Sequence, residues 1–290
     1  MIVDAHYHLE ERIETVDRLL DQMDLHGIDR VALMPALNDP FTFGGFVEKL
    51  SGLGRWALKG GWRGLGMYLY RSMVAEDGRF VILNKSYPIY DEPDNESVAR
   101  VMQAHPDRFY GWIVVNPKVA NPITEVDRWV GRPGWVGVKI HPSLHRYPVA
   151  TADDVAAYCN ENGLPLMVHL GGDRERGDYR YLPDRYPNLK IVYAHAGVPF
   201  WEELWNYVRE MDNVFIDLSG QYLDDPLRLK AVKVLGAEKC LYGTDGPYGF
   251  PDADGSYDHG RILNEILNWP VPEVDKKRIL GGNFKEITGT

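Results

Sequence analysis

Eight short apolar runs, separated by longer segments with helical spacing, constrain the fold of this chain more than any other feature of its sequence. The runs lie at 2–6, 30–34, 109–115, 136–140, 164–169, 190–195, 214–218 and 239–243. Helical spacing between them covers 13–25, 96–105, 152–162, 201–211 and 226–235, with Gly27, Gly163 and Gly236 as predicted C-terminal stops. This alternation is typical of repeated strand–helix units around a parallel sheet. It predicts an α/β fold, a (β/α)8 TIM barrel formed by residues 1–290 as a single domain, with a doubly wound open sheet as the alternative.

Polar residues close or directly follow several of these runs. They are His6, His8, His169, His195 and Asp245. In a barrel the ends of the strands meet at one rim, so these side chains are expected to converge there. Side chains alternate along a strand, and His6 and His8 therefore project to the same side, where they can share one metal ion. Imidazole nitrogen and carboxylate oxygen together suit a divalent metal such as zinc.

The composition excludes several classes of protein. Hydrophobic residues make up 44% of the 290 residues, which is ample for a globular core, and the net charge of −10 argues against a nucleic-acid surface. No run approaches the roughly 20 apolar residues of a spanning helix, so stable membrane insertion is not expected. Cys159 and Cys240 are the only cysteines, which is unlike a disulfide framework and favours the cytoplasm.

One stretch, residues 44–75, breaks the rhythm of the repeats. Glu48 is its only acidic residue, against five basic ones, and its apolar residues have helical spacing on both sides of Gly60-Gly61. We therefore predict a helical hairpin inserted after the second strand. It could act as a lid whose arginine holds an anionic substrate, or it could pack on the barrel or on a second subunit in a homodimer. Contact with a membrane surface is a third hypothesis.

The order and spacing of these motifs resemble the amidohydrolase superfamily, and more narrowly its amidohydrolase 2 branch, which includes the aminocarboxymuconate-semialdehyde decarboxylase group. The resemblance covers nearly the whole chain. It rests on the His-x-His pair of the first strand, the histidines that end the fifth and sixth strands, and Asp245 in Gly-Thr-Asp-Gly-Pro. Segments 105–109, 190–197 and 274–284 are also similar to this branch. A TatD-type nuclease would carry a glutamate in a Gly-Glu context at a middle strand end, and the sequence has none there.

The resemblance implies an enzyme that binds one divalent metal ion, with zinc expected and manganese or another transition metal as alternatives. The implied ligands are His6, His8, His169 and Asp245. Asp245 would also act as the general base, and His195 would polarise the substrate or orient the nucleophile. Asp4 is expected to orient a neighbouring histidine, whereas Asp217 is expected only to satisfy backbone groups.

The substrate is predicted to be a small molecule, anionic and cyclic or aromatic. Lys139 and His141 end the fourth strand and are expected to face it, with Lys139 uncarbamylated as the branch implies. The other predicted substrate contacts are two arginines as anion clamps and two aromatic residues near the mouth: Arg55, Arg63, Trp56 and Tyr248.

Three functions follow from these residues. The preferred hypothesis is a hydrolase in which metal-activated water attacks an ester, lactone or amide, with Asp245 as base. The alternative is a metal-dependent, non-oxidative decarboxylase of a small hydroxy-aromatic or unsaturated carboxylic acid. A catalytically silent metal-binding barrel is the third, although such a barrel would usually lack Asp245.

Overall fold

The eight predicted strands are all present and form one parallel sheet in the computed structural model, which describes residues 1–40, 46–75, 77–82, 85–250 and 256–290. In sheet order they are β1 (Val3–Leu9), β2 (Arg30–Pro35), β5 (Phe109–Val114), β6 (Trp135–Ile140), β7 (Leu166–Val168), β8 (Ile191–Tyr193), β9 (Val214–Asp217) and β10 (Cys240–Leu241). The order in the sheet equals the order in the chain, as a TIM barrel requires.

Backbone hydrogen bonds close the sheet between its first and last strands. The Ala5 N–H donates to the Tyr242 carbonyl at 2.9 Å, and the Asp245 N–H donates to the His6 carbonyl at 2.8 Å. The His8 N–H completes the seam with a 2.7 Å bond to the Gly246 carbonyl. The open-sheet alternative is therefore wrong, because its edge strands would not meet.

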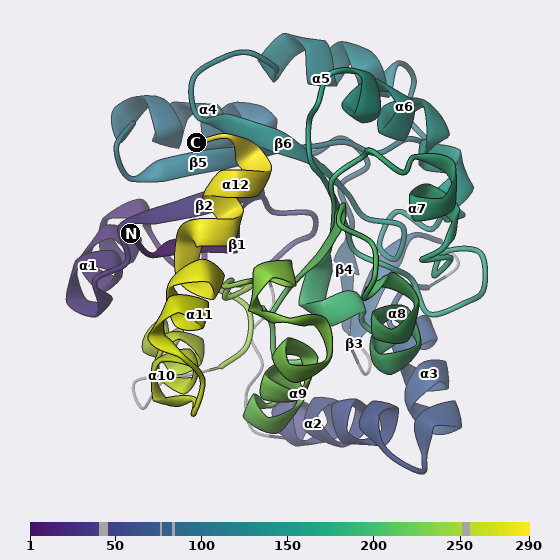
Figure 1. The fold of residues 1–290 in the computed structure, drawn as a ribbon. Coiled ribbons are helices and arrows are strands. Elements are labelled where there is room, and N and C mark those ends of the chain that lie inside the picture. Colours follow the sequence, from purple (N-terminus) through teal and green to yellow (C-terminus); the bar gives the residue numbers. More distant parts are fainter. Residues whose placement is uncertain (41–45, 76, 83–84, 251–255) are drawn as a thin grey trace.

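Helices follow most strands and surround the barrel (Figure 1). They are α1 (Val16–His26), α4 (Asn95–Ala104), α5 (Pro122–Trp129), α6 (Asp153–Glu161), α7 (Tyr181–Arg185), α8 (Trp201–Val208), α9 (Asp225–Leu235), α10 (Gly260–Asn268), α11 (Glu273–Lys277) and α12 (Asn283–Thr288). The predicted stop at Gly27 is confirmed, since its φ of 67° is the left-handed conformation that ends α1. The Thr15 side chain accepts the Arg18 N–H at the other end of the same helix.

Two buried clusters make up the core. The larger one lies between the strands and the surrounding helices and contains outward-facing strand residues such as Ile113, Ile191 and Ile216. The smaller one fills the barrel and contains Val3, Ala5 and Trp112. Phe284 and Ile287 of α12 belong to this inner cluster. The C-terminal helix therefore closes the barrel on the side opposite the carboxyl ends of the strands.

A β-bulge in β1 determines which residues of the first strand face the interior. Val3 and Ala5 pack in the inner cluster, but Tyr7, which regular alternation would put on the same face, packs in the outer one. The strand pairing shifts register between Asp4 and Tyr7, so one extra residue lies there. A bulge of this kind re-aims the side chains that follow it. As a result His6 and His8 point into the barrel.

The predicted hairpin after the second strand is also present, as α2 (Phe46–Lys59) and α3 (Arg63–Ser72). Its helices cross closely at Gly66, where a Cβ atom would lie 2.4 Å from the Leu58 nitrogen. Lys59 pairs with Asp224, and Arg63 pairs with Glu203 at 2.7 Å, so the hairpin packs beside α9 and α8 (Figure 1). An antiparallel strand pair that the sequence did not predict follows, β3 (Arg79–Ile82) and β4 (Lys85–Pro88).

Two further predictions concern the environment of the protein. Cys159 and Cys240 are both buried free thiols, as expected for a chain without a disulfide framework. Among the described helices, none combines the length and the apolar character needed to cross a membrane.

Candidate active site

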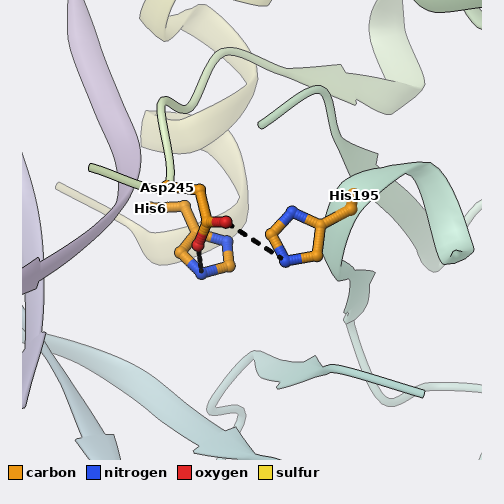
Figure 2. Close-up of side chains that lie close together, drawn as sticks. All are labelled: His6, His195 and Asp245. Atoms are coloured by element: carbon orange, nitrogen blue, oxygen red, sulfur yellow. Dashed lines mark ion pairs between the residues drawn. The ribbon is translucent and has the colours of Figure 1, made fainter. Parts of the chain in front are cut away.

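Three side chains from distant parts of the chain meet at the strand ends of the barrel (Figure 2). His6 lies on β1, His195 follows β8 and Asp245 follows β10. One ligand atom from each lies within 4.8 Å of the other two. The His6 Nε2 is 3.4 Å and the His195 Nε2 is 3.9 Å from a carboxylate oxygen of Asp245. The convergence predicted for these residues therefore exists in the fold.

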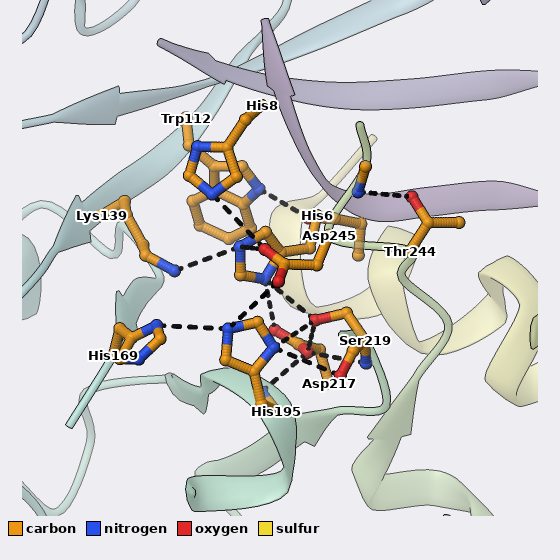
Figure 3. Close-up of polar contacts among 12 residues, drawn as sticks. His6, His8, Trp112, Lys139, His169, His195, Asp217, Ser219, Thr244 and Asp245 are labelled. Carbon is orange, nitrogen blue, oxygen red and sulfur yellow. Dashed lines mark hydrogen bonds and ion pairs between the residues drawn. The ribbon is translucent and has the colours of Figure 1, made fainter. Parts of the chain in front are cut away.

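His8 and His169 lie at the edges of this group (Figure 3). The His8 Nε2 is 3.5 Å from Asp245 Oδ1, and the His169 Nδ1 is 3.2 Å from the His195 Nε2. All five residues predicted at the strand ends thus form one connected cluster. The compact group differs from the implied ligand set, because it contains His195 in place of His8 and His169.

Two of the cluster residues are held in left-handed backbone conformations, which are costly for residues other than glycine. The φ angle is 52° at His195 and 64° at Asp245. Two indole N–H groups stabilise the turn that contains His195. Trp201 donates to the His195 carbonyl at 3.2 Å and Trp205 to the Ala196 carbonyl at 2.8 Å. The surrounding structure therefore holds this turn in a strained conformation, which is common at functional sites.

In each of the four histidines, the ring nitrogen that points away from the cluster has a hydrogen-bond partner. His6 Nδ1 is 2.9 Å from Asp217 Oδ2, and His8 Nδ1 is 3.4 Å from the Pro35 carbonyl. His195 Nδ1 is 3.2 Å from the Ser219 carbonyl, and His169 Nε2 is 3.0 Å from the Tyr70 hydroxyl.

These partners assign the tautomers. A carboxylate and a carbonyl can only accept, so the nitrogens that face them carry the ring proton. Burial, followed by the charge of Lys139, lowers the pKa of His6 to about 3, and burial lowers the pKa of His169 well below its usual value. Both rings are neutral at neutral pH, and lone pairs of the histidines face one another and the Asp245 carboxylate. A cation bound among these acceptors would satisfy them together.

The spacing of these acceptors fits a metal ion. Two ligands held about 2.0–2.2 Å from one ion lie roughly 3.0–3.6 Å apart. The separations of 3.2, 3.4 and 3.5 Å within the cluster fall in that range, and 3.9 Å lies slightly beyond it. Nitrogen-rich sites that include a carboxylate suit zinc and neighbouring transition metals. The residues present therefore fit the divalent ion that the sequence predicted.

Asp217 has a larger role than predicted. Its Oδ2 accepts from His6, while its Oδ1 accepts the backbone N–H groups of His195 at 2.9 Å and Ser219 at 3.0 Å, together with the Ser219 hydroxyl (Figure 3). Burial raises its pKa, but the His6 and His195 imidazoles and Lys139 lower it, and the net shift is downward. The ionised carboxylate orients two histidines at once. Its position at the end of a strand was the only signal in the sequence.

Asp4 contacts a neighbouring histidine, as predicted, but through the backbone of His6 and not through its ring. It accepts the backbone N–H of His6 and that of Thr244, each at 3.0 Å, and the Thr244 hydroxyl. The bulge in β1 explains the difference, because it separates the face of Asp4 from the face of His6. Burial raises the pKa of Asp4 to about 7 against these hydrogen bonds. Asp4 therefore ties the first strand to the segment that carries Asp245.

The two predicted residues of the fourth repeat differ in position. Lys139 is fully buried beside the cluster, and its Nζ points toward His6 Nε2 at 3.5 Å (Figure 3). Burial lowers its pKa to about 8, although Asp217 and Asp245 oppose that shift. His141 stacks on His169 with ring centroids 4.0 Å apart. Its Nδ1 accepts the Leu144 N–H at 3.1 Å, which leaves the proton on Nε2.

A cavity of about 280 Å³ opens against the cluster, with His8, His169, His195 and Asp245 in its wall. Three of the predicted substrate contacts also line it, His141, Arg55 and Tyr248. Most of the remaining wall is apolar and comes from the hairpin and the segment after it: Leu58, Leu69, Tyr70, Met73, Val74, Phe80 and Val81. The volume is slightly below the usual range for drug-sized ligands, so a small molecule fits.

Three predicted substrate contacts do not line the cavity: Lys139, described above, and the two hairpin residues Trp56 and Arg63. Trp56 is on the outer side of α2 with 56% of its surface exposed, and it is not among the cavity residues. Arg63 pairs with Glu203 and donates to the Pro199 carbonyl at 3.2 Å, so its guanidinium fixes the hairpin to the barrel. The sequence could not distinguish these positions, because which face of each helix turns inward depends on how the hairpin docks.

Comparison with known proteins identifies the family. A model of the amidohydrolase family (Amidohydro_2) matches residues 3–285, and the chain belongs to this family. It is therefore an enzyme, as the sequence predicted. No match is found among curated proteins.

Several solved structures share the fold at low sequence identity. The 4-oxalomesaconate hydratase of Rhodopseudomonas palustris has 17% identity and a TM-score of 0.65, with 100% of this chain and 96% of that chain covered. The 5-carboxyvanillate decarboxylase of Sphingomonas paucimobilis has 18% identity and a TM-score of 0.61, with 99% of this chain and 98% of that chain covered. A dihydroxybenzoic acid decarboxylase of Polaromonas sp. JS666 was solved with manganese and the inhibitor 2-nitroresorcinol. It has 17% identity and a TM-score of 0.60, with 99% of this chain and 96% of that chain covered. At these identities the likeness shows the TIM-barrel fold.

Proposed function

We propose that this protein is a metal-dependent, non-oxidative decarboxylase of a small hydroxy-aromatic or unsaturated carboxylic acid. The observation that carries the proposal is the cavity, in which a mostly apolar wall faces a cluster of acceptors suited to a divalent cation. Such a space suits a flat apolar ring with a polar edge turned to the cluster. The names of the decarboxylases that share the fold support the same class. This conclusion replaces hydrolysis, which the sequence alone favoured.

Binding is assigned to two side chains that line the cavity. His141 is neutral because burial, followed by Lys139, lowers its pKa well below the usual value, and its remaining proton lies on Nε2. It can donate that proton in a hydrogen bond to a substrate oxygen. Arg55 lines the same cavity, and a guanidinium matches a carboxylate in two parallel hydrogen bonds. Tyr248 packs edge-on against the His8 ring, 5.6 Å between centroids, and limits the width of the space.

The cluster would hold the metal through His6, His195 and Asp245, with His8 and His169 as further ligands. A divalent ion there supplies a Lewis acid for the carboxylate and neighbouring hydroxyl oxygens of the substrate. We expect zinc because most of the donors are imidazole nitrogens, and manganese is the alternative that the Polaromonas structure suggests.

Asp245 is the proton carrier in the proposed reaction. Burial raises its pKa, but His195, His8 and His6 lower it, and the net shift is downward, so the group starts as a carboxylate. It takes the proton of the substrate hydroxyl and passes it to the ring carbon that bears the carboxylate group. The bond from that carbon to the carboxylate then breaks, its electron pair returns to the ring, and CO2 leaves. A proton from solvent restores the hydroxyl of the product.

Hydrolysis of a small ester or lactone is the second candidate. The observation in its favour is the ionised state of Asp245, because a general base must be deprotonated to activate water. The retained His6-x-His8 pair is compatible with both reactions.

Product analysis separates the two reactions. Protein loaded with zinc or with manganese is incubated with dihydroxybenzoates in D2O, and with a panel of lactones and esters. We expect CO2 release and one deuterium on the carbon that lost the carboxylate, and at least 100-fold less of both in Asp245→Asn. Lactone opening without CO2 from any hydroxybenzoate would contradict the proposal.

Three other assignments belong to the proposal. The hairpin α2–α3 forms a wall over the site, because its residues line the cavity, and the barrel and hairpin act as one domain of residues 1–290. The buried free thiols suit a reducing compartment, and we propose a cytoplasmic location.

A further inference from the structure

The hairpin reaches the cluster through one side chain, Tyr70 of α3. This tyrosine is 4% exposed and lines the cavity. Its hydroxyl lies 3.0 Å from His169 Nε2 and 3.0 Å from the Leu170 carbonyl oxygen. The bond to His169 joins residues 99 positions apart in the chain.

The direction of these two hydrogen bonds follows from counting protons. A phenol has one proton, and a carbonyl oxygen can only accept, so the Tyr70 hydroxyl donates to Leu170. The Tyr70 oxygen must then accept the Nε2–H of His169. This leaves the lone pair of His169 on Nδ1, the atom that faces His195 Nε2 at 3.2 Å.

His169 differs from the other three histidines in the origin of its partner. Asp217, Pro35 and Ser219, which orient His6, His8 and His195, belong to barrel strands or to the residues directly after them. Tyr70 belongs to a hairpin inserted between strands. The Tyr70 ring packs closely against Gly172, where a Cβ atom would lie 2.8 Å from the ring.

Neighbouring contacts hold Tyr70 in this seat. Arg71 donates from Nε to the Gly172 carbonyl, directly beside the ring. At the C-terminal end of the hairpin, Arg146 donates to the Val74 carbonyl at 2.8 Å and also to the Ala75 carbonyl. The last turn of α3 therefore packs against the loop that follows His169.

We propose that Tyr70 is a positioning residue that fixes the tautomer of His169, so that docking of the hairpin and metal binding are coupled. The proposal rests on the metal site of the proposed function. Because coupling between two sites is reciprocal, a docked hairpin raises metal affinity and a bound metal stabilises the docked hairpin. The hairpin would then be docked in both forms, and it would open less often in the metal-loaded protein than in the metal-free protein.

Tyr70→Phe tests this proposal, because it keeps the ring and removes only the hydroxyl. We expect the affinity of the metal-free protein for Zn²⁺ or Co²⁺ to fall 10- to 100-fold, the usual effect of removing the partner of a ligating histidine. Tyr222→Phe is the matched control, because Tyr222 also lines the cavity. The centroid of its ring lies 6.4 Å from that of His169 and 5.4 Å from that of His195. The affinity of this variant should stay within threefold of wild type.

Two measurements that do not depend on activity complete the test. In the metal-free protein, 15N chemical shifts of labelled histidine should report one His169 tautomer in wild type and a mixture in Tyr70→Phe. Hydrogen exchange in residues 63–72 should slow on metal binding in wild type and respond less in the variant. Gly172→Ala, which displaces the ring but keeps the hydroxyl, should reproduce the loss of affinity.

The outcomes are decisive in both directions. Unchanged metal affinity in Tyr70→Phe, or an equal loss in Tyr222→Phe, would overturn the proposal. If wild-type protein bound no transition metal, the proposed function would fail instead. The tautomer measurement would still report on Tyr70 in that case, because it uses the metal-free protein.

Discussion

Asp217→Asn is expected to weaken metal binding sharply although Asp217 is not itself proposed as a ligand. The carboxylate receives His6 Nδ1–H on one oxygen and three donors on the other. An asparagine of the same shape has only one oxygen. If that oxygen keeps the three donors, the amide NH2 faces the His6 N–H, and two donors meet at about 2.9 Å. His6 must then move its proton to Nε2, the atom that faces Asp245.

The magnitude follows from the role of such partners. Changing the group that orients a ligating histidine typically costs 10- to 100-fold in metal affinity. At a metal concentration 100 times the wild-type Kd, binding stabilises the fold by about 2.7 kcal/mol. A 30-fold weaker variant gains only about 0.9 kcal/mol at the same concentration. With an unfolding entropy of about 2.1 cal/mol/K per residue over 290 residues, the Tm shift is about 4 °C for wild type and about 1.5 °C for the variant.

The assay is a thermal unfolding series with increasing Zn²⁺, run beside a competition titration against a chromophoric chelator. Asp212→Asn is the matched control, because Asp212 is exposed and lies just before β9, the strand that ends with Asp217. It should keep the wild-type shift. An Asp217→Asn protein that folds and retains wild-type metal affinity would refute the tautomer argument, since His6 would then be shown to bind without its partner.

Two further predictions concern stability. Gly66→Ala should destabilise the α2–α3 hairpin by about 1–3 kcal/mol, because the new Cβ meets backbone atoms of Leu58. Gly64→Ala, with open space around it, should be neutral or stabilising, and hydrogen exchange across 46–72 distinguishes the two. Burial lowers the pKa of His145 to about 4, so the unfolded chain, with its pKa near 6.5, takes up the proton first as the pH falls. His145 should therefore remove about 3 kcal/mol of stability between pH 6.5 and 4, and denaturant titrations of His145→Gln should lack this component.

The strands and the hairpin could be predicted from the sequence because their signals are local. An apolar run such as 136–140 or 190–195 specifies a buried strand without reference to the rest of the chain. The short pair β3–β4 had no such signal, since the side chains of Lys85–Pro88 are largely exposed. The bulge in β1 was also hidden, because it depends on the register with β2.

The site was predictable in its members and not in its hydrogen bonds. The five residues at the strand ends converge because the barrel brings all strand ends to one rim. The pairing of Asp217 with His6 spans 211 positions, and that of Tyr70 with His169 spans 99. Neither distance leaves a pattern in a single sequence. For Trp56 and Arg63, residue type suggested binding, and only the docking of the hairpin decided against it.

The backbone hydrogen bonds that close the barrel limit which insertions and deletions the sequence can accept. The peptide groups that join the first strand to residues 242–246 also set the spacing of His6 and Asp245. In the proposed enzyme, the stability of the fold and the retention of the metal would therefore be linked, and heat or denaturant that breaks these hydrogen bonds would also release a bound ion. A single residue gained or lost between Tyr242 and Asp245 would remove the fold and the chemistry together.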